Sequence, residues 1–369
     1  MQLQKVVEVL EGLAAPALAE DWDNVGLLAG DRGQSVGRAM FTIDLTRAVL
    51  TEARQAGVDL IVAYHPPIWD ATKRVVAGEG SSPLLYEVIR SGMAIYAMHT
   101  ALDVVEGGVN DLLAQAVGVA RPLPLAERMY GDGRYAKVIV FVPEADAARV
   151  SEAMFAAGGG CVGRYDRCSF RGRGVGTFRG GAGTRPAVGR AGRFEQVEEY
   201  RLETIVPRGR LGAVVEAMEA AHPYEEVAYD VVSLLEPAAS LGLGRFGELA
   251  EATAVGTLVE RIKKTLKVQA VGLIGPGRGR VRRVAVGAGS CGTLYRDAMA
   301  RGCDFYLTGE LKHHQALEIQ ERGKMTAVCV GHSNSERLAL PVMAKRLRQA
   351  CKGLDVRVSK KDHDPLLWK

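Results

Sequence analysis

Apolar and polar positions follow two alternating spacings over the first third of the chain. Short apolar runs typical of buried strands alternate with segments whose apolar residues recur at helical spacing. The strand-like runs are residues 39–45, 59–67 and 93–100, and the helical segments are residues 6–14, 48–57 and 84–92. This order of strands and helices predicts a layered α/β lobe.

The middle of the chain follows a different pattern. Residues 137–160 and 200–234 are two copies of one pattern, in which a strand ending in Val-Pro is followed by a helical segment and then by a return strand. A repeat of this kind predicts one supersecondary unit used twice. Between the copies, residues 170–199 are rich in Gly and Arg, a composition that predicts an exposed hairpin or loop. The middle therefore reads as a small inserted α+β domain.

The alternation of strands and helices resumes at residues 255–350. We therefore expect an α/β fold in which the outer segments form two similar lobes around the insert. The expected domains are a first lobe at residues 1–125, the insert at 126–236, and a second lobe at 237–369 that completes a ligand crevice. In such sheets the loops that follow the strand C-termini line the ligand crevice.

Composition narrows the class of protein. The 369 residues are 47% hydrophobic and 24% charged, as in globular proteins of two or three domains. The net charge of +4 is too small for a dedicated nucleic-acid binder, so nucleic acid is not an expected partner. Six cysteines without a C-x-x-C pair suggest reduced thiols and a cytoplasmic location. Neither a signal-peptide core nor an apolar stretch near the roughly 20 residues of a membrane span is visible, so no membrane contact is expected.

Histidines and carboxylates follow predicted strands in three places. His65 comes directly after one strand, while His99 and Asp103 are four residues apart, as are His332 and Glu336. Side chains four apart on a helix face the same way, so each pair can converge. Two imidazoles and two carboxylates without a thiolate suit Zn, Fe, Mn or Co better than a structural zinc. Any one of these histidines alone is more often a hydrogen-bonded strand end, and this alternative stays open.

Two other patterns carry competing interpretations. The segment GAGSCG, Gly287–Gly292, follows a predicted strand and precedes a helix, with Glu310 about 20 residues on, as in a dinucleotide-binding loop. A tight turn without a ligand explains the same glycines. The arginines of residues 170–199 could contact phosphates or simply face solvent. His313 and His314 are adjacent near a helix start and cannot share one face.

Five motifs in this order resemble one known family. They are EDWDNVGLLAGD, YHPPIW, HTALDVVEGGVNDLLA, GAGSCGTLYRDAMARGCDFYLTGELKHHQA and GHSNSERLALPVMAKRL. The sequence resembles the GTP cyclohydrolase I type 2 homologues, also described as the NIF-three-like, dinuclear-metal-centre family. The resemblance covers both outer segments. The middle resembles the PII-like or CutA-like, ferredoxin-like domain of the longer bacterial members.

The resemblance implies divalent metal ions, one or two per subunit, and a homohexamer. His65, Asp103, His332 and Glu336 fall on the family's metal-ligand positions. It further implies that His99 and His314 line the same pocket, and we expect them to take part in catalysis, with a pocket histidine shuttling protons.

One position departs from the family pattern. The family has two consecutive histidines before the proline, and here the first is Tyr64. A phenol with a pKa near 10 ligates these metals less readily than an imidazole does. A second metal site is therefore in doubt, while Zn, Fe and Mn all remain candidates for the first.

These observations support a metal-dependent hydrolase that acts on a nucleotide or another phosphorylated small molecule, with GTP cyclohydrolase-like chemistry as one candidate. The alternative is a non-catalytic hexamer that senses metal or acts as a regulatory scaffold. A ring associated with nucleic acid is the weaker alternative.

Overall fold

A computed structural model describes residues 1–77, 84–130, 135–163, 165–234 and 236–366. The chain divides into two compact units. Unit 1 combines Met1–Arg128 with Ala238–Lys369, and unit 2 is Met129–Pro237. Each unit has its own sheets and its own core, so each is described by itself.

The first sheet of unit 1 has five strands. Their order is β1 (Gly26–Ala29), β4 (Ala94–Ala97), β3 (Leu60–Ala63), β2 (Arg38–Thr42) and β15 (Asp355–Val358). Strands β4, β3, β2 and β15 are parallel to one another, and β1 pairs antiparallel with β4. All residues of β3 and β4 are buried, as expected for parallel strands covered on both faces.

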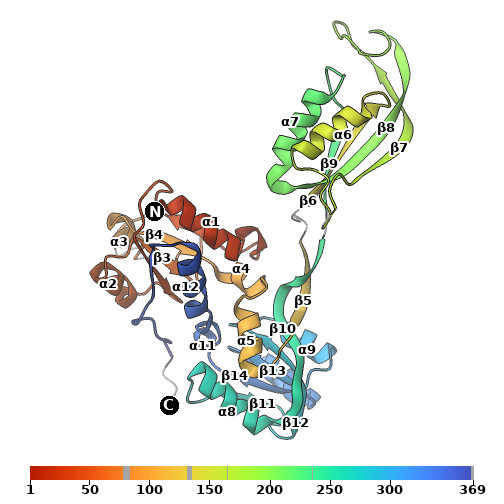
Figure 1. Cartoon of the computed structure of the whole chain (residues 1–369). Coiled ribbons are helices and arrows are strands. Elements are labelled where there is room, and N and C mark those ends of the chain that lie inside the picture. Colours follow the sequence, from red (N-terminus) through yellow and green to blue (C-terminus); the bar gives the residue numbers. More distant parts are fainter. Residues whose placement is uncertain (78–83, 131–134, 164, 235, 367–369) are drawn as a thin grey trace. The chain divides into compact units, whose positions relative to one another are not determined.

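Helices cover this sheet on both faces. The helices of this part of unit 1 are α1 (Leu3–Leu13), η1 (Pro16–Leu18), α2 (Arg47–Gln55), α3 (Leu85–Arg90), α4 (His99–Val104), α5 (Val109–Val117) and α12 (Ala339–Ala350). In Figure 1, α1 and α12 lie side by side over the strands, away from α2 and α3. Helix α2 begins at a normal cap, because the Thr46 side chain accepts a hydrogen bond of 3.2 Å from the Val49 amide.

The second sheet of unit 1 has six strands. Their order is β11 (Gly272–Ile274), β14 (Thr326–Cys329), β13 (Phe305–Thr308), β12 (Arg280–Gly287), β10 (Glu236–Ala254) and β5 (Leu123–Tyr130). Strands β12, β13 and β14 are parallel, while β10 and β11 pair antiparallel with their neighbours. The accompanying helices are α8 (Val255–Leu266), α9 (Leu294–Ala300), α10 (His313–Arg322) and α11 (His332–Glu336).

The two sheets share one hydrophobic core and exchange strands. Buried residues from β3 and β4 belong to the same apolar cluster as Phe305 and Val328 of the second sheet. Strand β5 comes from the N-terminal segment but joins the second sheet, and β15 from the C-terminal segment joins the first. The two segments of unit 1 are therefore interwoven.

Unit 2 is a four-stranded antiparallel sheet with two helices. The strand order is β7 (Ser169–Arg179), β8 (Phe194–Pro207), β6 (Tyr135–Pro143) and β9 (Tyr229–Ser233), with η2 (Arg208–Arg210) following β8. Helices α6 (Ala147–Ala156) and α7 (Leu211–Ala221) pack together, and their apolar residues share a core with one face of the sheet. The Gly- and Arg-rich segment forms the paired strands β7 and β8 and the turn between them.

The α/β fold class predicted from the sequence is confirmed by these mixed sheets and helices. Among the described residues, none of the helices combines the length and apolar character that crossing a membrane requires.

Candidate metal centre

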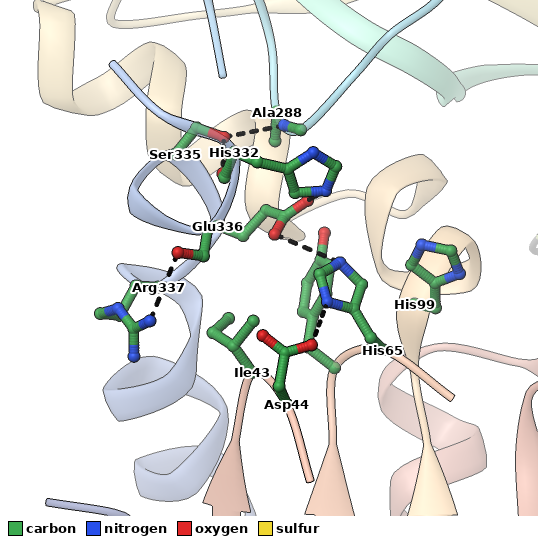
Figure 2. Close-up of polar contacts among 12 residues, drawn as sticks. Ile43, Asp44, His65, His99, Ala288, His332, Ser335, Glu336 and Arg337 are labelled. Carbon is green, nitrogen blue, oxygen red and sulfur yellow. Dashed lines mark hydrogen bonds and ion pairs between the residues drawn. The ribbon is translucent and has the colours of Figure 1, made fainter. Parts of the chain in front are cut away.

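Three side chains of unit 1 converge where strands of both sheets end. His65 follows β3, and His332 begins α11 three residues after β14. Glu336 lies one helical turn after His332, so both side chains face the same way. One ligand atom from each of these three residues lies within 4.8 Å of the other two. Figure 2 shows Glu336 between the two imidazole rings.

Glu336 is the buried centre of this cluster. Its side chain is only 4% exposed. Glu336 Oε1 lies 3.2 Å from His332 Nε2, and Oε2 lies 3.4 Å from His65 Nε2. Oε2 is buried and makes no hydrogen bond with the described residues. Among these residues, the ion pair with His65 alone offsets the burial of this oxygen, and a divalent cation would satisfy it more fully.

Two further carboxylates orient the imidazole rings. His65 Nδ1 donates to Asp44 Oδ1 at 2.9 Å, and His332 Nδ1 donates to Glu310 Oε1 at 3.1 Å. Because each ring uses Nδ1 for a carboxylate, its Nε2 remains directed at Glu336 (Figure 2). A carboxylate behind a histidine is the usual support of a metal-binding imidazole.

The electrostatics of the cluster follow from burial and close opposite charges. Burial opposes a charge on His65, but its contacts with Asp44 and Glu336 outweigh burial and raise its pKa to about 10. The hydrogen bond with Glu336 raises the pKa of His332 to about 9, against burial. Burial also disfavours the charged form of Glu336, yet the two imidazoles hold its pKa below the usual range. Without a metal ion the three groups thus form a charged, mutually stabilised set.

Tyr64 and Asp103 form a separate pair beside the cluster. The Tyr64 hydroxyl donates to Asp103 Oδ1. Burial raises the pKa of Asp103 to about 7, and burial together with the charges of Asp103 and Glu336 raises that of Tyr64 well above its usual range. Asp103 was predicted as a metal ligand, but the three-residue group of mutually close ligand atoms does not include it. Its side chain instead accepts a hydrogen bond from the Tyr64 hydroxyl.

The two predicted catalytic histidines lie in different surroundings. His99, the first residue of α4, is buried, and its ring lies 5.2 Å from that of His65 between centroids. Its Nδ1 donates to Asp23 Oδ1 at 2.8 Å. His314 is exposed on α10, and none of the contacts given for the described residues joins it to the cluster.

The glycine-rich loop after β12 lies against the cluster. Gly289 has a φ of +66°, and a Cβ there would lie 2.4 Å from Glu336 Oε1 and 3.3 Å from His332 Nε2. The Gly289 amide donates to Ser335 Oγ at 2.8 Å, which joins the loop to α11 (Figure 2 shows Ser335 beside Ala288). Glu310 binds His332. The loop and its acidic partner therefore support the cluster, in agreement with the interpretation of a tight turn.

We expect Gly289→Ala to weaken metal binding about 10-fold or more, the effect typical of disturbing the support of a metal site. The new methyl group would clash with Glu336 Oε1 unless this oxygen moved, and the movement would displace a proposed metal ligand. Dissociation constants for zinc, measured by competition with a chromogenic chelator, provide the test.

Gly292→Ala is the matched control. Gly292 lies in the same loop with a φ of +53°, but a Cβ there meets no atom within 4 Å. Both variants should lose roughly 1–2 kcal/mol of stability from the left-handed backbone, and only Gly289→Ala should lose metal affinity. Equal zinc affinities in the two variants would contradict a role for Gly289 in giving room to the ligands.

Some residues around the cluster were not identified from the sequence. Asp44 lies two residues after β2, the same relation to a parallel strand that singled out His65. It could have been found by applying that rule to every strand. Asp23, which binds His99, lies in the loop before β1 and gave no comparable signal.

The residues present fit a divalent metal ion. The cluster offers two imidazole nitrogens turned away from their supporting carboxylates, and a buried carboxylate oxygen without a hydrogen bond. Nitrogen and oxygen donors of this kind bind Zn, Fe or Mn. The sequence-based expectation of a metal-binding cluster is supported to this extent, whereas the identity and number of the metal ions belong to the proposal below.

Comparisons with known proteins agree with the resemblance seen in the sequence. Residues 1–365 match the family Duf34/NIF3 (NGG1p interacting factor 3). A Bacillus subtilis protein called GTP cyclohydrolase 1 type 2 homolog is 34% identical over 369 residues, or 99% of this chain and 98% of the relative. A Mycobacterium bovis protein of the same name is 35% identical over 338 residues, or 91% of this chain and 88% of that protein. The crystal structure of a Bacillus cereus protein related to NIF3 matches with a TM-score of 0.78 at 33% identity, covering 100% of this chain and 99% of that one. The chain therefore belongs to the Duf34/NIF3 family.

Proposed function

We propose that this protein is a metal-dependent hydrolase that acts on a nucleotide or a related phosphorylated small molecule. One observation carries the proposal: His65, His332 and Glu336 bring two imidazoles and one carboxylate together. Structural zinc sites are closed by four protein ligands, whereas catalytic sites use three and leave a position open for water or substrate. A divalent metal ion bound here would act as a Lewis acid and would activate water as a nucleophile.

The protein's own residues have separate tasks in this proposal. Asp44 and Glu310 fix the imidazole rings of His65 and His332, so that both Nε2 atoms stay available as ligands. Glu336 contacts both rings from its buried position. His99, oriented by Asp23, lies beside His65 and is the proposed proton-transfer group. A catalytic role for His314 remains a sequence prediction.

The proposal includes one metal ion per chain. The Tyr64 hydroxyl donates a hydrogen bond to Asp103 Oδ1, so this oxygen already has a partner. Burial raises the pKa of both side chains and so favours their protonated forms, which are poor metal ligands. The names of the relatives favour nucleotide chemistry, since two of them are called GTP cyclohydrolase 1 type 2 homolog.

His99→Ala should lower kcat about 10²- to 10⁴-fold and leave the metal content unchanged, because general acid–base catalysis contributes an effect of this size. Protein reconstituted with zinc, iron or manganese would be assayed on a panel of nucleotides and phosphoesters, with metal measured by elemental mass spectrometry. The parent should turn over at least one substrate at about 1 per second or faster.

His313→Ala is the control, because His313 is exposed on α10. It should behave like the parent. A metal-loaded parent that turns over nothing on the panel would refute the hydrolase and favour the metal-sensing or scaffold alternative. Full activity in His99→Ala would refute the assignment of His99.

A further inference from the structure

Two tryptophan rings lie exposed beside the metal cluster. Trp22 and Trp69 are 61% and 51% exposed, their ring centroids are 6.3 Å apart, and their planes differ by 15°. Single exposed apolar side chains are ordinary, but a pair of nearly parallel indole rings is a large apolar surface. Such a surface next to a polar site suggests a binding function.

Hydrogen bonds anchor the residues next to both tryptophans. Asp23, whose side chain is fully buried, accepts hydrogen bonds from His99 Nδ1 and from the Thr100 amide at 3.1 Å. The neighbouring Asn24 donates from Nδ2 to the Ile68 carbonyl at 2.7 Å. The residues next to both tryptophans are thus anchored. A pre-ordered surface loses little entropy when it binds a ligand.

The aromatic surface continues into the cluster. The His99 ring meets both indoles edge-on, with centroid distances of 5.8 Å to Trp22 and 5.2 Å to Trp69. The Trp69 ring lies 6.3 Å from the ring of His65, which belongs to the cluster. The indoles are therefore in ring contact with His99 and, through Trp69, with a residue of the cluster.

The charged side chains that contact the cluster favour an uncharged part of a ligand, rather than an anionic one, on the neighbouring indoles. The partners of the cluster imidazoles are carboxylates, Asp44 and Glu310, which are 40% and 52% exposed. These negative charges disfavour an anionic group unless a metal ion neutralises it. An uncharged planar ring gains from stacking on indole without this penalty.

We propose that Trp22 and Trp69 bind the planar heteroaromatic ring of the substrate, a ring of the nucleobase kind, and thereby direct the rest of the molecule to His65, His332 and Glu336. This inference rests on the proposed function and names the substrate class for the same site. Stacking of a base on an aromatic side chain is worth a change in affinity of about 5- to 150-fold. Each tryptophan that stacks on the ring should contribute a factor within this range.

The experiment measures nucleoside binding to the zinc-loaded full chain. Guanosine and adenosine are the ring-bearing probes, and ribose is the probe without a ring. The chain has three tryptophans, so Trp368→Phe leaves Trp22 and Trp69 as the only indole fluorophores. Quenching of their fluorescence and titration calorimetry should both report binding of the nucleosides and none of ribose.

Substitutions then separate stacking from folding. Trp22→Leu and Trp69→Leu keep an apolar side chain but remove the ring, and each should weaken nucleoside binding about 5- to 150-fold. Trp22→Phe and Trp69→Phe keep a ring and should retain most of the affinity. Phe170→Ala, at an exposed aromatic residue of unit 2, is the control and should change nothing. Zinc content should be the same in all five variants.

The inference is overturned by no nucleoside binding at millimolar concentration, by equal binding of ribose, or by leucine variants that bind nucleosides as the parent does. A change in the association state of the leucine variants without nucleoside binding would also overturn it, because the indoles would then contact a second copy of the chain. The proposed function fails separately, because nucleoside binding that depends on both tryptophans can exist in a protein that hydrolyses nothing.

Discussion

Glu336→Ala is expected to reduce the affinity for zinc more than 100-fold and to leave purified protein nearly free of metal. Glu336 supplies the buried carboxylate that contacts both imidazoles, and its Oε2 has no hydrogen bond within the described part of the chain. Loss of groups that only support a metal ligand already costs 10- to 100-fold, so loss of a ligand should cost more. Elemental mass spectrometry of protein purified without chelator should find about one metal ion per parent chain.

Two further variants provide an intermediate and a negative control for this loss of zinc affinity. Glu310→Gln keeps the shape of the side chain that binds His332 Nδ1 but removes its charge, and we expect a 10- to 100-fold loss of affinity. Glu260→Gln, on the exposed surface of α8, should have no effect. Two metal ions per parent chain would contradict the proposed single site, and normal metal content in Glu336→Ala would show that the metal is held by other groups.

Arg245→Met is expected to destabilise unit 1 by about 3–5 kcal/mol, because it leaves a buried carboxylate without its partner. Arg245 on β10 is 1% exposed, and two of its nitrogens donate to the two carboxylate oxygens of Asp111 on α5, each at 2.9 Å. The same guanidinium donates to the carbonyl oxygens of Gly242, Gly244, Val104 and Val105. Urea unfolding followed by circular dichroism measures the loss.

A double-mutant cycle identifies the cause of the loss. Adding Asp111→Leu to Arg245→Met removes the unpaired charge, so the double variant should be more stable than the sum of the single effects implies. Arg322→Ala breaks an exposed pair with Glu318 and should leave the unfolding midpoint unchanged. Strict additivity of Arg245→Met and Asp111→Leu would show that the two side chains are not coupled.

Local sequence rules predicted the parts of the site that depend on strand ends and helix spacing. His65 was identified because parallel strands bring their carboxyl ends to one edge, and His332 with Glu336 because residues four apart share a helix face. The structure brings these three together. The same spacing rule selected His99 and Asp103, but it does not show which other side chains compete for them. In the structure His99 binds Asp23, and Asp103 binds Tyr64.

Local sequence rules could not predict contacts between segments that are far apart in the chain. Arg245 and Asp111 are 134 residues apart, and nothing in the sequence around Arg245 indicates a buried side chain. The strand exchange was also not anticipated, because residues 123–130 and 355–358 were not predicted as strands, and hydrophobic periodicity does not assign a strand to a sheet. Residues 355–358 and 123–130 could each have paired within their own segment, and the choice depends on the completed core.

The strand exchange has a consequence for biosynthesis. Strand β15 is the last of the described strands in sequence order, so the sheet that carries His65 gains this outer strand only after its other strands have been translated. His332 and Glu336 also emerge from the ribosome late, more than 260 residues after His65. Pairing across so long an interval makes the closing step slow. The proposed metal site can therefore be completed only after α11 has been translated, and a nascent chain that stalls before α11 carries only His65 of the three clustered side chains.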